Sequence, residues 1–203
     1  MNEPFVDRMS KDIILKLIAR AFGGDFFRRF GLDLPAIVDA LSVELPDLTV
    51  RTQSADVFLR LANGDIAHFE AQWIMGREDL GRFASYHLEA HRRHGVDIHT
   101  IVLCGPALRE EPAPLRTSSM VFAPTYILLG REQAETVVAT LQAIVARGDP
   151  LGGVDKISLL LPLMRRHGSL EALFESAVPV VQALPEPDRA QIMYRLTVLP
   201  LPR

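Results

Sequence analysis

A tight turn between two alternating segments constrains this chain more than any other feature. Asn63-Gly64 lies between residues 57–61 and 66–73, two runs rich in β-branched, aromatic and other apolar residues. An Asn-Gly pair between such runs is a strong short-range indication of a β-hairpin. The sequence therefore predicts a sheet in the middle of the chain, with the remaining elements arranged around it.

Apolar periodicity predicts further strands and helices on both sides of this hairpin. Strands are predicted over 98–103 and 120–129, a polar loop over 106–118, and a helix over 79–94 that stops at Gly95. Helices are also predicted over 10–21, 35–41, 134–145, 157–164, 170–184 and 189–199, and a short turn over 26–30. A strand–helix–strand order with helices at both ends favours an α/β sandwich.

Length, charge and cysteine content bound the function classes. A chain of 203 residues suits one domain with at most an appendage, and its single cysteine, Cys104, excludes an internal disulfide framework or a multi-cysteine metal site. No signal peptide or apolar run of about 18 residues is found, so we expect a cytoplasmic protein without a membrane span. The net charge of −3 means that any phosphate-binding surface has to be local.

The length of the hairpin loop decides where Asp56 points. A two-residue loop would put Asp56 on the face opposite to Glu70. A three-residue loop over 62–64, with Gly64 in a left-handed conformation, instead pairs position 56 with position 70. The two carboxylates then lie opposite each other with Cβ atoms roughly 5 Å apart, and Gln72 shares their face.

Two facing carboxylates are costly unless one is protonated or a cation lies between them. Oxygen ligands with a nearby amide suit Mg²⁺ or Mn²⁺, and such an ion can bind phosphate oxygens and activate a water molecule. The alternative is a solvated strand face on which the carboxylates pair with Arg60 or His68. Spacing alone leaves both interpretations open.

Three stretches resemble the PD-(D/E)XK nuclease superfamily, and more narrowly its recombination-promoting nuclease and transposase branch. They are S-A-D-V at 54–57, H-F-E-A-Q at 68–72 and the R-x-x-x-Y pair at 82 and 86. They occur in the order and spacing of that branch, and the resemblance covers about residues 10–130. Ala55 stands where the wider superfamily has proline.

The resemblance implies a fold of the α/β class with a restriction-endonuclease-like core, a mixed sheet flanked by helices. The order expected is helix, three-stranded meander, helix and a strand beside the meander. This nuclease-like domain would span 1–148, followed by a helical C-terminal extension over 149–203. We expect a magnesium-dependent endonuclease that hydrolyses DNA phosphodiester bonds, with a link to DNA recombination.

The resemblance also assigns site residues. Asp56 and Glu70 would hold Mg²⁺ or Mn²⁺ with the Ala71 carbonyl, and Glu44 would supply an additional carboxylate. Gln72 occupies the place of the superfamily's catalytic lysine. Glutamine can orient the attacking water but supplies no positive charge to the developing phosphorane.

Residues on the following predicted helix are candidates for DNA contact. Arg82 and Tyr86 share one face, either to grip a phosphate or Glu70, or to anchor the helix to the sheet. Arg92 and Arg93 would form a modest basic patch on a nucleic-acid backbone. Three histidines nearby have zinc-compatible spacing, although a solvated helix face is favoured for them: His87, His91 and His94.

Two other functions compete with the nuclease. One is a catalytically weak or inactive relative of the same fold that binds nucleic acid or protein, which the −3 charge and the absent lysine favour. The other is a small α/β scaffold in which Asp56 and Glu70 merely solvate a strand face. DNA is the expected partner, no membrane partner is expected, and a homodimer is left open.

Overall fold

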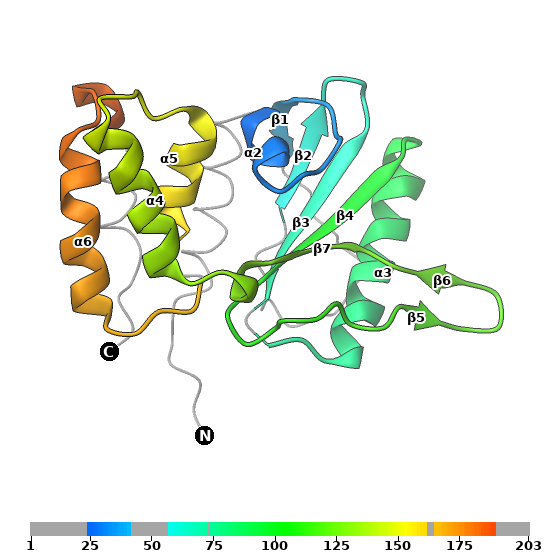
Figure 1. The fold of residues 1–203 in the computed structure, drawn as a ribbon. Helices are drawn as coiled ribbons and strands as arrows, with labels where there is room; N and C mark the ends of the chain where they lie inside the picture. The colour runs from blue at the N-terminus through cyan, green and yellow to red at the C-terminus, as the bar shows by residue number, and fades with distance from the viewer. Residues whose placement is uncertain (1–23, 42–56, 73, 162–164, 190–203) are drawn as a thin grey trace.

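A computed structural model describes residues 24–41, 57–72, 74–161 and 165–189, and within them a mixed five-stranded sheet has helices on both faces (Figure 1). The sheet order is β1 (Ile37–Leu41), β2 (Val57–Leu61), β3 (Ile66–Gln72), β4 (Ile98–Cys104) and β7 (Thr125–Leu128). Strands β1, β2 and β3 form an antiparallel meander, whereas β3, β4 and β7 are parallel. The predicted α/β class with a mixed sheet flanked by helices is confirmed.

The β2–β3 hairpin has the register expected of a three-residue loop. The Leu61 amide donates to the Asp65 carbonyl at 2.8 Å, and Gly64 has a φ of +93°. Glycine adopts this conformation readily because it lacks a Cβ atom. Val57 and Phe69 form the last described pair of the ladder, so Asp56 lies just outside the described residues.

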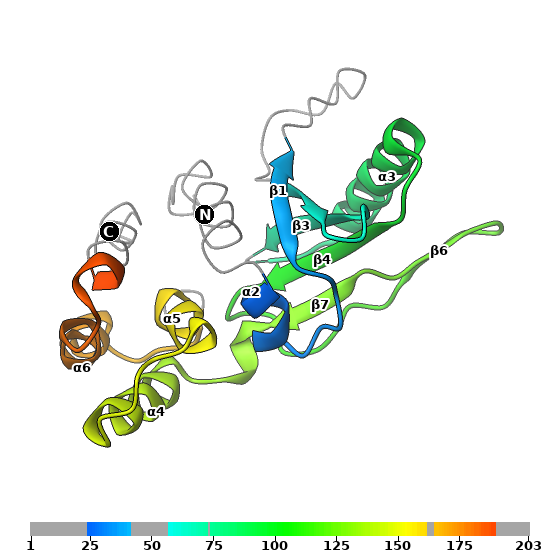
Figure 2. The ribbon, with the colours of Figure 1, turned by 90° about the horizontal axis from the view of Figure 1, so that it is seen from above.

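Helices lie on both sides of the sheet, and Figure 2 shows α3 on the side opposite to the other described helices. This helix, α3 (Arg77–His94), ends before Gly95, whose φ of +66° gives the predicted left-handed C-terminal cap. In the part of the chain that the structure describes, the other side carries α2 (Gly24–Arg29), α4 (Ala134–Ala146), α5 (Gly153–Leu160) and α6 (Leu170–Gln182). None of the helices in the described ranges is long and apolar enough to cross a membrane.

The two faces of β3 differ in chemistry. Ala67 and Phe69 point into the larger apolar core, where the Phe69 ring meets the Phe26 ring of α2 at a centroid distance of 5.0 Å. The even-numbered residues point to α3, and they include two fully buried polar side chains, His68 and Glu70. The polar candidates therefore lie on the α3 face, because strand residues alternate between faces.

The prediction of a helix over 35–41 is wrong, because Ile37–Leu41 form the edge strand β1. Residue Ile37 pairs with Leu61, and the register shifts between Ile37 and Asp39. Two adjacent β-branched residues, Ile37 and Val38, favour a strand once β2 offers hydrogen bonds. Pairing with a distant strand overrides the local helical spacing.

Four other predicted boundaries change. The turn over 26–30 is the short helix α2, and α5 begins at Gly153 rather than at residue 157. The predicted loop over 106–118 contains β5 (Leu115–Arg116). The single strand predicted over 120–129 is two, β6 (Val121–Phe122) and β7, because Pro124 between them has no N–H to continue a ladder.

The remaining predicted segments are only partly described. Strands β2, β3 and β4 and helices α3, α4 and α6 lie where they are predicted, within a few residues at their ends. The predicted helices over 10–21 and 189–199, apart from residue 189, lie outside the described residues, as does Trp73. The boundary near residue 148 stays a prediction, and α5 contributes Ile157 to the same apolar core as Phe26.

Candidate functional site

Glu70 is the central residue of the candidate site. It lies in β3, pairs across the parallel ladder with Val102, and its side chain is completely buried under α3. Its neighbour on the same face, His68, is also fully buried, and His68 Nε2 lies 3.4 Å from Glu70 Oε1. A carboxylate is rarely buried without a polar side chain beside it, because desolvation of the charge costs free energy.

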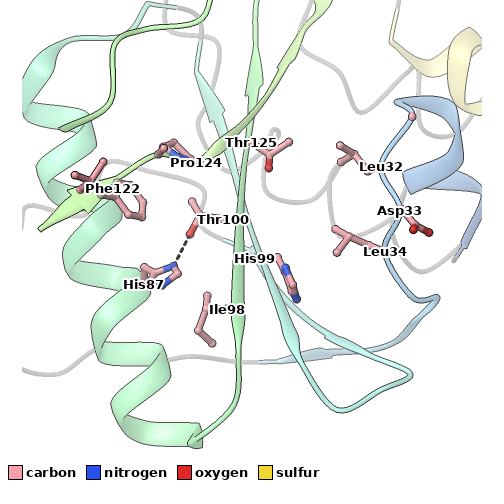
Figure 3. Close-up of a pocket in the computed structure, with 13 residues that line it drawn as sticks. Leu32, Asp33, Leu34, His87, Ile98, His99, Thr100, Phe122, Pro124 and Thr125 are labelled. Carbon is pink, nitrogen blue, oxygen red and sulfur yellow. Dashed lines mark hydrogen bonds between the residues drawn. The ribbon is translucent and has the colours of Figure 1, made fainter. Parts of the chain in front are cut away.

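A line of polar side chains connects Glu70 to α3. Thr100 Oγ1 of β4 lies 3.5 Å from His68 Nδ1 and forms a 3.1 Å hydrogen bond with His87 Nδ1. The second contact is drawn in Figure 3. Burial lowers the pKa of His87, so its imidazole is held in the neutral form. The sequence does not reveal this line, because its members come from β3, β4 and α3.

The Ala71 carbonyl points away from β4. The Ile66 amide donates to the Asp97 carbonyl, and the Gln72 carbonyl accepts from the Gly105 amide at 2.7 Å. Even-numbered residues of β3 therefore direct their main-chain groups to β4, and odd-numbered residues direct theirs to β2. Ala71 follows the last described β2–β3 pair, so its carbonyl lies on the side where β2 leaves the described residues.

Arg82 and Tyr86 lie on the buried side of α3. The Tyr86 ring is buried and meets the His68 ring edge-on at 6.0 Å, which supports the anchoring interpretation for this residue. Arg82 Nη2 lies 3.2 Å from Asp79 Oδ1, and the guanidinium covers the Phe83 ring at 5.0 Å. Arg82 Nε is buried without a hydrogen-bond partner among the described residues, so this cation keeps a donor for a further ligand beside its ion pair with Asp79.

The position of Arg82 along β3 can be inferred from the contacts of the α3 residues around it. Tyr86 lies over His68, whereas Leu80 and Phe83 pack in one cluster with Val102. Val102 pairs with Glu70. Arg82 therefore lies near the carboxyl end of β3, the end that carries Glu70 and Gln72.

A cavity that sequence reasoning missed lies at this end of the sheet. Its volume is about 440 Å³, and residues 75–77 and 112–116 form most of its wall. Two cations, Arg77 at the start of α3 and Arg116 of β5, line it. Arg77 follows Gln72, the last residue of β3, by five positions in the chain. The sequence gives no indication that Arg116 lines a cavity with Arg77, because the two residues are far apart in the chain.

Residues of the predicted basic patch and of the histidine cluster have partners close to them in the chain. Arg92 forms two hydrogen bonds with Glu89, at 2.8 and 2.7 Å, which lower the pKa of that carboxyl group. Arg92 follows Arg82 by ten residues, or about 15 Å along the helix. His91 Nδ1 contacts the Val96 carbonyl at 2.7 Å. Within the described part of the chain, no three His, Cys, Asp or Glu side chains gather as a metal site.

The donors that are described suit a hard cation. The Glu70 carboxylate and the Ala71 carbonyl are both oxygen donors, the chemistry that Mg²⁺ and Mn²⁺ prefer. The predicted partners Asp56 and Glu44 lie outside the described residues. Cys104, at the end of β4, is buried, and burial raises the pKa of its thiol to about 12, so it is unsuited to nucleophilic catalysis.

Comparisons with protein-family models, curated proteins and solved structures give no match to this chain. Its function has therefore to be inferred from the side chains and their placement.

Proposed function

We propose that this protein is a metal-dependent nuclease of the PD-(D/E)XK type that hydrolyses DNA phosphodiester bonds. The observation that carries the proposal is the Glu70 carboxylate, buried completely in the β2–β3 hairpin at a register that allows a facing carboxylate. Val57 pairs with Phe69 in this register, and continuing it by one residue is the arrangement expected for Asp56 opposite Glu70.

The order of elements supports the proposal. The meander β1–β2–β3 is followed by α3 and then by β4, which lies beside β3. This is the order that the resemblance to the nuclease superfamily implies. The α3 face carries both Glu70 and Gln72, as the sequence signature requires.

The residues have distinct roles in the proposed reaction. Glu70, the Ala71 carbonyl and Asp56 would hold Mg²⁺ or Mn²⁺, which when bound lowers the pKa of a water molecule and neutralises phosphate oxygens. His68 fixes the orientation of the Glu70 carboxylate from 3.4 Å. Gln72 orients the attacking water through its amide, which has both a donor and an acceptor.

Arginines supply the positive charge that Gln72 lacks. Arg82 retains a buried donor, Nε, near the carboxyl end of β3, and Arg77 and Arg116 line the cavity there. Guanidinium groups bind phosphate oxygens in a fork geometry that suits a DNA backbone. These local cations are compatible with the net charge of −3, since the rest of the surface does not need to be basic.

A DNA-binding module without robust catalysis is the second candidate. It is favoured by Gln72, a neutral residue at the position from which lysine stabilises the phosphorane in the wider superfamily. Cleavage assays with metal separate the two functions.

The test combines cleavage with metal binding. Purified protein is incubated with supercoiled plasmid and with single-stranded DNA in Mg²⁺, Mn²⁺ or EDTA, and the melting temperature is measured in each metal. We expect metal-dependent cleavage and a higher melting temperature, because an ion bound to the native state stabilises it by mass action. Glu70→Gln should abolish both effects, whereas Glu175→Gln, an exposed carboxylate on α6, should change neither.

The outcomes are distinct. Metal stabilisation without cleavage excludes the nuclease and leaves the metal site in place, and undiminished cleavage by Glu70→Gln excludes the assigned site. If neither metal stabilisation nor cleavage is observed, the paired-carboxylate interpretation fails.

A further inference from the structure

A second cavity, of about 500 Å³, lies at the open edge of β4 (Figure 3). On one side it is bounded by His87 of α3 and by Phe122, and on the other by Leu32 and Leu34 of the loop that follows α2. The edge of β4 lies between these two walls. The volume is within the range of small-molecule sites, about 300–1,000 Å³.

The part of β4 that faces this cavity has β3 on one edge and, among the described residues, no strand on the other. Strand β4 pairs with β3 from Ile98 onwards, but its pairing with β7 begins only at Ile101, opposite Thr125. The missing pairs follow from Pro124, which precedes Thr125 and has no N–H group to donate. The edge at residues 98–100 is therefore left open.

Two main-chain groups point from this edge into the cavity. The Asp97 carbonyl and the Gly105 amide both bond to β3, so odd-numbered residues of β4 face β3 and even-numbered residues face the other way. The Ile98 carbonyl and the Thr100 amide consequently point to the open side. Both residues are more than nine-tenths buried, and a buried peptide group without a partner is costly.

The cavity wall disfavours an anionic ligand. Its thirteen lining residues include the carboxylate of Asp33 and no lysine or arginine. His99 already contacts Asp65 at 3.1 Å, and burial lowers the pKa of His87, which keeps that imidazole neutral. A phosphate would find no cation here, whereas a neutral group with hydrogen-bonding edges and apolar faces would be well accommodated.

We propose that this cavity binds a nucleobase, as a base or nucleoside, in the plane of the sheet at the edge of β4. A nucleobase presents a donor beside an acceptor on one edge, which matches the Ile98 carbonyl and the Thr100 amide. Its two faces then lie between His87 and Phe122 on one side and Leu32 and Leu34 on the other. For adenine, the N6 amino group donates to Ile98 and N1 accepts from Thr100.

This site is separate from the proposed metal site. It lies at the amino end of β4, whereas Glu70 and Gln72 pair with residues at the carboxyl half of that strand, Val102 and Cys104. Base binding requires no metal and no cleavage, so it can hold or fail independently of nuclease activity.

The test compares three small probes in an NMR titration of the isotope-labelled full chain without metal. Adenosine should shift the Thr100 amide signal, and N6,N6-dimethyladenosine, which lacks the N6 donor, should bind about tenfold more weakly, the equivalent of one hydrogen bond. Ribose 5-phosphate should not bind. A short oligodeoxyadenylate shows whether the site also takes a base within a strand.

Two valine substitutions provide a matched control. Val121 of β6 lines the cavity and Val178 of α6 does not, although their exposed fractions are similar, 56% and 47%. Val121→Trp should fill the mouth of the cavity and weaken adenosine binding at least tenfold, whereas Val178→Trp should leave it unchanged. Equal affinity for adenosine and its dimethyl analogue, binding of ribose 5-phosphate, or no binding of adenosine would each overturn the proposal.

Discussion

His68 Nε2 lies 3.4 Å from Glu70 Oε1, and both side chains are fully shielded from solvent between β3 and α3. The other ring nitrogen of His68 faces Thr100 Oγ1, which in turn bonds His87. A buried polar line of this kind stabilises the fold only while each member has its partner. Glu70 is therefore oriented by residues that never reach the proposed metal.

Removing the Thr100 hydroxyl should destabilise this line. Thr100→Val preserves the volume but deprives the half-buried His87 of its partner, so we expect the free energy of unfolding to fall by about 1–3 kcal/mol. Thr100→Ser retains the hydroxyl and should lose about 1 kcal/mol or less, the cost of one methyl group. Urea denaturation followed by circular dichroism measures both. A valine variant as stable as the parent would show that the hydroxyl contacts contribute nothing.

Gln72→Lys should convert the site to the arrangement of the wider superfamily. A cation beside Glu70 would stabilise the phosphorane, so the cleavage rate at saturating Mg²⁺ should rise or at least persist. The same cation competes with the metal for the carboxylates, so the apparent Mg²⁺ affinity should fall. Cleavage rates measured across a Mg²⁺ titration test both effects, and a variant unchanged in rate and affinity would place Gln72 outside the site.

Two glycine-to-alanine substitutions should change stability in opposite directions. Gly64 has a φ of +93°, a conformation that strains alanine, so Gly64→Ala should lower the free energy of unfolding by about 1 kcal/mol. Gly81 lies within α3, where an added Cβ meets nothing within 4 Å, and Gly81→Ala should raise it by up to about 1 kcal/mol. A Gly64→Ala variant with an unchanged or higher melting temperature would contradict the assigned loop conformation.

The pKa of His87 predicts a pH dependence of stability. Burial lowers this pKa below its ordinary value of 6.5, and the charges of His68, His91, His99 and Asp97 also act on the ring. Below about pH 6.5 the unfolded chain binds the proton more readily, so stability should fall as the pH falls. His87→Gln should flatten the melting temperature between about pH 7 and pH 5. A titration of the His87 ring by NMR with a midpoint at or above 6.5 would refute this.

Local chemistry explains why the hairpin could be predicted. The loop that contains Asn63-Gly64 is short, and its register depends on the conformation of one glycine, so the positions opposite Glu70 follow from adjacent residues alone. The C-terminal glycine of α3 is predictable for the same reason. In both places the deciding interactions lie within a few residues of each other.

Features that depend on distant partners could not be predicted. Residues 37–41 became β1 because β2 pairs with them, and no local signal reports that partner. The line from His68 through Thr100 to His87 joins three elements, and the cavity wall unites Arg77 with Arg116 across about forty positions of sequence. In each of these three features the residues become neighbours only in the folded structure.

The parallel pairing of β3 with β4 has a consequence for the order of folding. The loop of the hairpin has three residues, whereas Ile66 and Ile98, which pair across β3 and β4, are separated in the chain by the whole of α3. Because closing a longer loop costs more entropy, the hairpin should form first with its α3 face still hydrated. We therefore expect the Glu70 carboxylate to lose its hydration only when α3 docks on the sheet.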